Sequence, residues 1–404
     1  MSMLSVDEAL ERILSSVMPT GTETVPIAEA GNRILAEPVI ARLNQPPFDC
    51  SAMDGYALIA PEPVTYPFTA EIIGESAAGM HFTGTLHPGQ AVRIFTGAPL
   101  PDGADTVVIQ ENTARTGNQV TILDGVSKGR HIRRAGLDFT MGEMLVETGT
   151  RLDARHLALT AASGNATVTV AKRPRIAILA TGNELVLPGT PPGPDQIIAS
   201  NNYAIGAIVR SAGGIADDQG ILHDNLDMIT TAIDAAIARG SDIIVTSGGA
   251  SVGDHDYVAA ALKANQVEIG FWKIAMRPGK PLMYGRKTIS GRVVHFLGLP
   301  GNPVSSFICS LVFLRPLIAT LTGLKQTVTP QPAILGVDMP TNGERRDFVR
   351  VKLESDATGR LVATPFPVQD SSMLTALARS DAILIRRENA PAARAGDDCE
   401  IVPL

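Results

Sequence analysis

Residues 247–257 read Ser-Gly-Gly-Ala-Ser-Val-Gly-Asp-His-Asp-Tyr and combine three glycines with two carboxylates. Glycine lets a backbone adopt positive φ and approach a ligand closely. Successive N–H groups of such a loop can bind an anion, and Asp254 and Asp256 can hold a hard cation such as Mg²⁺. A site for phosphate and metal chemistry needs both an anion-binding loop and carboxylates that hold a cation. The alternative interpretation is a tight turn whose acids cap the next helix.

Three loops of this kind each follow a predicted strand. The apolar runs 176–179, 242–246 and 293–297 precede Thr181-Gly-Asn-Glu184, the loop at 247–257 and the loop at 298–306, respectively. Ligands of open parallel sheets bind beyond the carboxyl ends of the strands, so we expect the three loops to lie together.

The third loop reads Gly-Leu-Pro-Gly-Asn-Pro-Val-Ser-Ser. Pro303 suits the first turn of a helix. Gly301 and the free N–H groups of that turn can bind an anion, and Ser305 and Ser306 add hydroxyl donors.

Cations and acids accompany these loops. Lys273, Arg277 and Lys280 stand in a segment shaped by prolines and a glycine, and such side chains bind phosphate and other oxyanions. The acids are Glu184, Asp224, Asp254 and Asp256. This composition predicts a metal-dependent site for a phosphorylated or adenylated small molecule. The sequence has no Walker A motif, no Gly-x-Gly-x-x-Gly after a strand and no Gly-x-Ser-x-Gly elbow, which disfavours kinases, dehydrogenases and serine hydrolases.

The bulk composition narrows the class of protein. A chain of 404 residues is too long for one core, and its net charge of −7 gives no general basic surface for nucleic acid. Cys50, Cys309 and Cys399 are too few and too scattered for a disulfide framework, which fits a reducing cytoplasm. We expect no signal peptide, and the apolar stretch 307–324, interrupted by Arg315 and Pro316, predicts a buried helix rather than a membrane span.

Periodicity divides the chain into regions of different texture. Ser5-Val-Asp-Glu8 is a capping box that opens an amphipathic helix. Short β runs with Gly/Pro turns, as at 91–95, 106–109 and 119–122, predict a small β domain from about residue 45 to 138. Alternating strands and helices from 176, with Ser200 capping the first helix, predict a parallel sheet covered by helices on both faces. Residues 326–404 return to strands, at 333–337, 348–353, 361–365 and 382–385, and suit a small β-barrel or sandwich.

Taken together, the motifs resemble the MoeA family, the molybdopterin molybdenumtransferases, which also include the E domain of gephyrin. The matching segments run in family order over nearly the whole chain: Pro47-Phe-Asp49, Ser51 to Tyr56, Phe95 to Pro101, Arg134 to Asp138, Thr181 to Leu185, Ser247 to Tyr257, Lys273 to Pro281, Leu299 to Ser305, Arg345 to Arg350 and Gln369 to Ser372.

The resemblance implies an architecture of four domains. They are an elongated domain from residues 1–44 and 139–171, an inserted β domain at 45–138, a MogA-like α/β domain that binds molybdopterin at 172–325, and a C-terminal β-barrel at 326–404. It also implies a cytoplasmic homodimer whose active cleft joins the α/β domain of one subunit to the inserted domain of the other. Other cofactor-synthesis proteins and recipient molybdoenzymes are possible partners.

The implied reaction converts adenylated molybdopterin and molybdate to molybdenum cofactor and AMP, with Mg²⁺-dependent cleavage of the adenylate. The resemblance assigns catalytic roles to Asp54, Thr96, Asp138, Glu184, Asp224, Asp256, Lys273, Arg277 and Lys280. Glu184, Asp254 and Asp256 are the expected metal ligands. Substrate binding falls to Ser247, Gly248, Gly249, Ser251, Gly253, Pro300, Gly301, Asn302, Pro303, Ser305, Arg345, Arg350 and Ser371, of which Ser305, Arg345, Arg350 and Ser371 join Arg277 and Lys280 around molybdate.

Two residues depart from the pattern of the family. Ala199 stands where many relatives carry an acid, and Arg277 stands where lysine is frequent, which keeps the charge but changes its geometry. These departures would also fit a degenerate paralogue of the family.

Two other functions compete with the transferase: a molybdopterin adenylyltransferase acting through the α/β domain alone, and a non-catalytic cofactor carrier or scaffold. A loss of cofactor formation in the Asp256→Ala variant would exclude the scaffold function.

Overall fold

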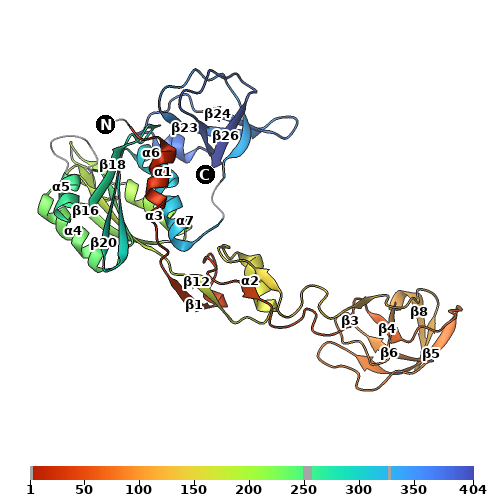
Figure 1. The fold of residues 1–404 in the computed structure, drawn as a ribbon. Coiled ribbons are helices and arrows are strands. Elements are labelled where there is room, and N and C mark those ends of the chain that lie inside the picture. The colour runs from red at the N-terminus through yellow and green to blue at the C-terminus, as the bar shows by residue number, and fades with distance from the viewer. Residues whose placement is uncertain (1–2, 249–256, 326–328) are drawn as a thin grey trace.

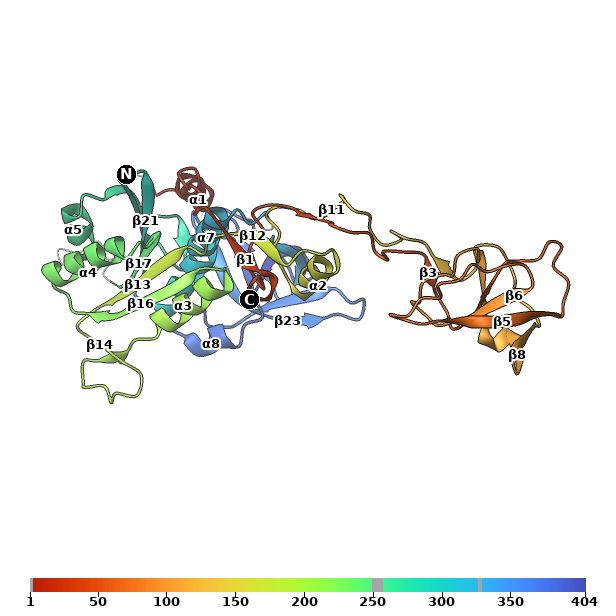
Figure 2. The same cartoon turned by 90° about the horizontal axis from the view of Figure 1, so that it is seen from below.

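The computed structural model describes residues 3–248, 257–325 and 329–404. The molecule is elongated (Figure 1), with an α/β unit and a barrel side by side at one end and a separate β sheet at the other. A narrow segment that the chain traverses twice joins the two ends (Figure 2).

The α/β unit is built on a six-stranded sheet of order β16-β13-β17-β21-β20-β18. Its strands are β13 (Arg175–Thr181), β16 (Ile215–Leu222), β17 (Ile243–Ser247), β18 (Glu268–Lys273), β20 (Pro281–Ile289) and β21 (Arg292–Leu299). The first four in spatial order are parallel, as predicted, whereas β20 pairs antiparallel with both β21 and β18. The sheet is therefore mixed at one edge. The Pro/Gly-rich segment between Lys273 and Pro281, which the sequence indicated only as a loop, joins the antiparallel strands β18 and β20.

Helices cover both faces of this sheet, as predicted. The helices are α3 (Asn201–Ser211), α4 (Leu226–Ala238), α5 (Tyr257–Ala264), α6 (Pro303–Cys309) and α7 (Arg315–Thr322), with a π-helical turn (Ser310–Leu314) between the last two. The cores of α3 and α6–α7 pack on one face, and those of α4 and α5 on the other. The continuous helical stretch Pro303–Thr322 is long and apolar enough to span a membrane, but 67% of it is buried inside the protein.

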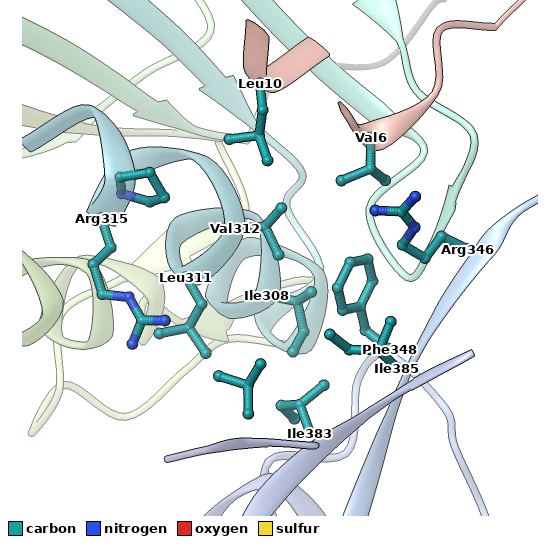
Figure 3. A pocket seen from close by; sticks show the side chains of 12 residues that line it. Val6, Leu10, Ile308, Leu311, Val312, Arg315, Arg346, Phe348, Ile383 and Ile385 are labelled. Atoms are coloured by element: carbon teal, nitrogen blue, oxygen red, sulfur yellow. The ribbon is translucent and has the colours of Figure 1, made fainter. Parts of the chain in front are cut away.

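The N-terminal helix α1 (Val6–Leu14) carries the predicted capping box, in which Ser5 and Glu8 bond each other's backbone N–H groups. Its face formed by Val6, Ala9 and Ile13 enters the same core as α3 and α6–α7. Between α1, the α6–α7 helix and the barrel lies an apolar pocket of about 200 Å³ (Figure 3). Arg346 stands at its edge, where it pairs with Asp7 and Glu388.

The C-terminal region is a closed barrel, which confirms the prediction. Its elements are β22 (Gln331–Leu335), β23 (Arg346–Ser355), β24 (Leu361–Pro365), α8 (Leu374–Ala378), β25 (Ala382–Arg386) and β26 (Asp398–Pro403). The pairing of β23 with β25 closes the sheet, and β19 (Met276–Arg277) adds to β23 from the α/β unit.

The far end of the molecule holds a six-stranded sheet of order β7-β4-β6-β5-β9-β8. These strands are β4 (Gly55–Leu58), β5 (Phe68–Ser76), β6 (Gln90–Ile94), β7 (Thr106–Ile109), β8 (Thr113–Thr116) and β9 (Gln119–Ile122). The connecting segment pairs outgoing with returning chain in three short ladders, and α2 (Ala154–Ala162) packs beside them. The ladders are β1 (Thr22–Pro26) with β12 (Thr167–Ala171), β2 (Val39–Ile40) with β11 (Met144–Val146), and β3 (Cys50–Ser51) with β10 (Ile132–Arg133).

A buried histidine lies inside the α/β unit. His295 of β21 is 0% exposed, its Nδ1 lies 3.1 Å from the Tyr284 hydroxyl, and that hydroxyl lies 3.1 Å from Ser16 Oγ. Desolvation, with a smaller effect of Arg286, lowers the pKa of His295 from 6.5 to about 4. The unfolded chain therefore binds a proton that the folded chain excludes between these two values.

We predict that His295 makes the α/β unit sensitive to acid. Its contribution to stability is complete above about pH 6.5 and is lost as the pH falls towards 4, which corresponds to about 2 kcal/mol between pH 7 and pH 5. Denaturant unfolding followed by the fluorescence of Trp272, the one tryptophan of the chain, reports on this sheet. The free energy of unfolding should depend less steeply on pH in His295→Gln, but not in the exposed control His87→Gln. An unchanged pH dependence in His295→Gln would contradict the prediction.

Candidate functional site

The carboxyl ends of the parallel strands meet at one edge of the α/β sheet. Thr181 at the end of β13 pairs with Leu222 of β16, and Ser247 at the end of β17 pairs with Ala180 of β13 and Leu299 of β21. The chain leaves β13 for its neighbour β16 and then crosses back to β17 on the other side. The direction of winding thus reverses at β13, where open α/β sheets bind ligands.

The loop after β13 presents Glu184 to solvent. Gly182 has a φ of +153°, and a Cβ there would meet the carboxylate of Glu184, so the acid folds back over this glycine. Neighbouring Asn183 accepts a hydrogen bond from the backbone N–H of Asp224 at 3.1 Å. The loops after β13 and β16 are thereby joined, and the two predicted acids Glu184 and Asp224 lie at the same edge.

Asn201, the first residue of α3, connects two of the predicted loops. Its Nδ2 donates to Ser247 Oγ at 2.7 Å and to the Gly301 carbonyl oxygen at 2.8 Å. Gly248 has a φ of +98°, and a Cβ there would meet the Thr181 carbonyl oxygen. Ser247 and Gly248, the described start of the glycine loop, therefore meet the loops after β13 and β21, and the glycine is required because two backbones approach each other.

The turn before α6 begins the helix as the sequence predicts. Pro303 occupies the first turn of α6, Pro300 is buried, and Ser305 is buried in the next residues of the helix. Asn302 Nδ2 donates to Ser371 Oγ at 2.9 Å, and the Val304 N–H donates to the Ser371 carbonyl oxygen at 3.0 Å. The predicted substrate residues Asn302 and Ser371 are thus bonded to each other.

These elements enclose a cavity of about 400 Å³, which we call the switch-point cavity. The lining residues that the sequence predicts as site residues are Glu184, Ser247, Gly248, Gly301, Asn302 and Pro303. Asn201, Asn202 and Ser372 line it as well, and the segment around β14 (Leu185–Val186) and β15 (Ile197–Ile198) forms an apolar rim that projects from the unit (Figure 2). Ala199 lies in this rim and is buried. The N-terminus of α3 opens into the cavity, an arrangement that favours anions.

A second cavity of about 500 Å³, here the barrel cavity, lies between Arg277 and the barrel. Arg277 forms an ion pair with Asp347, a carboxylate that is only 7% exposed. Arg350 is 1% exposed, and burial lowers the pKa of its guanidinium from the ordinary value. Its Nε donates to Gln369 Oε1 at 3.2 Å and its Nη1 to the Met373 carbonyl oxygen at 3.1 Å.

Three further predicted cations line neither cavity. Lys273 and Lys280 are exposed, and Arg345 is partly exposed. The carbonyl oxygen of Lys280 accepts from the N–H groups of Ile274 and Leu282, which holds this segment beside β18 and β20.

Asp54, Thr96 and Asp138 lie at the far end of the molecule. Asp54 Oδ1 accepts from Thr96 N at 2.7 Å and from Thr96 Oγ1 at 2.8 Å, and these bonds lower the pKa of Asp54. Asp138 and Gly97 line a hollow of about 380 Å³ at the base of the β sheet. Within one chain, the narrow segment separates this group from the switch-point cavity (Figure 1).

Five predicted residues lie outside the described part of the chain: Gly249, Ser251, Gly253, Asp254 and Asp256. Among residues 3–248, 257–325 and 329–404, no group of three or more His, Cys, Asp and Glu residues is placed to hold a metal ion. The carboxylate of Glu184 has no ion pair with any described residue, so it remains available to a cation at the mouth of the switch-point cavity.

Sequence reasoning missed Asn201, Asp347 and Gln369 as site residues. Asn201 stands at the start of a predicted helix, on the side of the sheet where the strands end. This position could have indicated that its side chain belongs to the site. Ser200 occupies the cap position, but its side chain makes no capping hydrogen bond. Asp347 and Gln369 stand in two of the segments that carry the resemblance, but the pattern does not indicate what they bond, because their partners Arg277 and Arg350 are distant in sequence or cross the barrel.

Three family descriptions match successive parts of the chain. They are the MoeA N-terminal region (domain I and II) over residues 4–164, a probable molybdopterin binding domain over residues 177–320, and the MoeA C-terminal region (domain IV) over residues 332–404.

Full-length relatives agree with this assignment. A molybdopterin molybdenumtransferase from Haemophilus influenzae is 34% identical over 406 aligned positions, covering 99% of this chain and 98% of the relative. Another from Nostoc sp. is 41% identical over 313 residues, covering 76% of this chain and 71% of the relative. The crystal structure of the molybdopterin biosynthesis moeA protein from Pyrococcus horikoshii is 27% identical, with a TM-score of 0.85 and complete coverage of both chains. The chain therefore belongs to the MoeA family.

Proposed function

We propose that this protein is a molybdopterin molybdenumtransferase, which inserts molybdenum from molybdate into adenylated molybdopterin and releases AMP during molybdenum cofactor biosynthesis. The observation that carries the proposal is the polar switch-point cavity, which three loops and the N-terminus of α3 enclose in a chain of the MoeA family. The family match outside the α/β unit favours this function over an adenylyltransferase that uses the α/β unit alone.

Adenylated molybdopterin is the proposed ligand of the switch-point cavity. Backbone N–H groups at the start of α3 suit its phosphates. Ser247, Gly248 and Gly301 line the cavity wall. Pro300, Asn302 and Pro303 shape the turn before α6. We assign the same ligand to Gly249, Ser251 and Gly253, which continue the loop after β17.

Glu184 and Asp224 fit a Mg²⁺ ion bound together with substrate phosphates. Mg²⁺ takes one or two carboxylates and keeps several water ligands, so a dense cluster of protein ligands is not required. We assign Glu184, Asp254 and Asp256 as ligands, with Asp224 beside them. When bound, the ion would neutralise phosphate charge as the adenylate is cleaved. The protein itself orients the phosphate towards these acids through the loops joined by Asn183 and Asn201.

The oxyanion molybdate is assigned to the side of the site that faces the barrel cavity. Arg277 is more than half exposed despite its pair with Asp347, and Lys273 and Lys280 add charge nearby along the chain. Arg350 and Ser371 already bond protein groups, and we assign them to shaping this wall. The roles of Ser305, which is buried, and Arg345, which lines neither cavity, rest on the resemblance to the family.

We further propose that two copies of the chain complete the active cleft. Asp54, Thr96 and Asp138 form a second polar group that is remote from the switch-point cavity of their own chain (Figure 2). A homodimer that brings one chain's inserted domain to the other's α/β domain would join them. This proposal includes the four-domain division expected from the sequence and a cytoplasmic location.

The function is tested with purified protein, adenylated molybdopterin, molybdate and Mg²⁺, with AMP release and activation of a cofactor-free molybdoenzyme as readouts. We predict turnover that falls about a hundredfold in Glu184→Gln, because the amide keeps the shape but loses the charge for the cation. The exposed control Glu37→Gln should retain the wild-type rate. Adenylate formation from ATP and molybdopterin alone would instead identify an adenylyltransferase, and binding without turnover would identify a carrier.

A second prediction separates the two substrates. Arg277→Ala should raise the KM for molybdate about tenfold or more, because an oxyanion loses a guanidinium partner, whereas Arg277→Lys should cost only a few-fold. The KM for adenylated molybdopterin should change little in either variant. Lys352→Ala, which removes a cation paired with Asp381 on the barrel, is the control for net charge. An equal rise in both KM values would contradict the assignment of Arg277.

A third prediction concerns the composite cleft. Asp54→Asn and Glu184→Gln chains should each be inactive alone. Co-expressed in equal amounts, they should recover about one quarter of the wild-type activity, because half of the dimers are mixed and each mixed dimer has one intact cleft. Differently tagged chains allow the mixed dimer to be isolated and assayed. An inactive mixed dimer would show that the two groups do not act across subunits.

A further inference from the structure

The amide of Asn201 joins two neighbouring segments that both line the switch-point cavity. Ser247 ends β17 and leads into the glycine loop, while Gly301 precedes the helix α6. These residues are 54 positions apart in the sequence, and each receives a hydrogen bond from the same Nδ2, at 2.7 and 2.8 Å. Both protons of this amide are therefore used to hold loop against loop.

The two recipients differ in how freely they can find another partner. Ser247 is only 3% exposed, so its hydroxyl depends on protein neighbours, whereas Gly301 is exposed at the cavity. Losing the amide would leave a buried hydroxyl without this donor and would free the Gly301 turn to move towards solvent. The connection also extends beyond Gly301, because the next residue, Asn302, bonds Ser371 in the wall shared with the barrel.

The neighbouring amide provides an internal comparison. Asn202 follows Asn201 in the same first turn of α3, also lines the cavity and is 5% exposed. Its Nδ2 donates to Asp218 Oδ1 at 2.8 Å, and Asp218 belongs to β16 rather than to either loop. Two adjacent asparagines thus have separate tasks, one anchoring the helix to the sheet and the other joining the loops.

We propose that Asn201 is a positioning residue that sets the width of the switch-point cavity for the adenylated pterin, by holding Ser247 and the Gly301 turn at a fixed separation. This inference rests on the proposed function for the identity of the substrate, but the geometry of the clamp does not depend on it. Asn201 acts through the loops, so its removal weakens the fit of the ligand that touches both of them. The binding of molybdate, which is assigned to the side of Arg277, is affected less.

The test compares Asn201→Ala with the matched control Asn265→Ala, a buried asparagine of the same α/β unit that does not line the cavity, in the full-length protein. Asn201→Ala should raise the KM for adenylated molybdopterin about tenfold or more, since misplacement of a bound group by about 1 Å costs factors of this order. The KM for molybdate should stay within about twofold of wild type. Asn265→Ala should leave both KM values unchanged even where it lowers the melting temperature, because the Nδ2 of this buried asparagine donates to the carbonyl oxygens of Ala261 and Thr230, away from the cavity.

A double-mutant cycle identifies the route of the effect. If Asn201 acts partly through Ser247, the losses in Asn201→Ala and Ser247→Ala should not add in the double variant. Additive losses, or equal KM changes in Asn201→Ala and Asn265→Ala, would overturn the proposal. AMP binding measured by calorimetry supplies a readout that needs no turnover. A wild-type protein without transferase activity would refute the proposed function, whereas AMP binding that is unchanged in Asn201→Ala would refute this inference.

Discussion

The in-register ending of the parallel strands is the constraint on which the rest of the site depends. Ala180, Ser247 and Leu299 lie side by side across β13, β17 and β21, and each strand continues directly into a loop. The strands are held in this register by buried aliphatic side chains on both faces, which belong to two separate core clusters. A slip of one residue would turn the buried side chains to the opposite face. The core therefore fixes where the loops begin, and the loops need few bonds of their own.

Those few bonds are supplied mainly by asparagine. Asn183 joins the loops after β13 and β16, Asn201 joins those after β17 and β21, and Asn302 joins the turn before α6 to the barrel. An amide can donate and accept from one short side chain without adding charge. A neutral connector adds no charge to the cavity, so Glu184 is its charged lining residue among those described. The amides thus hold the shape of the cavity without changing its electrostatics.

The sequence predicted most of the fold because periodicity and turn residues report directly on buried strands and amphipathic helices. The strands after 176, the capping box at Ser5 and the strands of the C-terminal region were all accessible in this way, whereas the resemblance to the family was needed to choose a barrel over a sandwich. The hairpin of β18 and β20 was not, because prolines and glycines between its strands indicated only a loop. The site followed the same rule: the positions of Glu184, Ser247 and Gly301 could be inferred from the strands before them. The contacts of Asp347 and Gln369, which stand in two of the matching segments, could not be inferred, since their partners depend on how the barrel closes against the α/β unit.

Several residues that a motif marks as ligands spend their hydrogen bonds on the protein. Arg350 is buried and bonds Gln369 and Met373, and Ser371 receives bonds from Asn302 and from the N–H of Val304. Gln369 returns the contact by donating to the Arg350 carbonyl oxygen at 3.0 Å. Segment 369–373 is consequently a wall between the two cavities, with Gln369 facing one and Ser372 the other. Removing Arg350 would disturb this wall on both of its sides. A loss of activity in such a variant therefore does not by itself identify a direct ligand, because a displaced wall would produce the same loss.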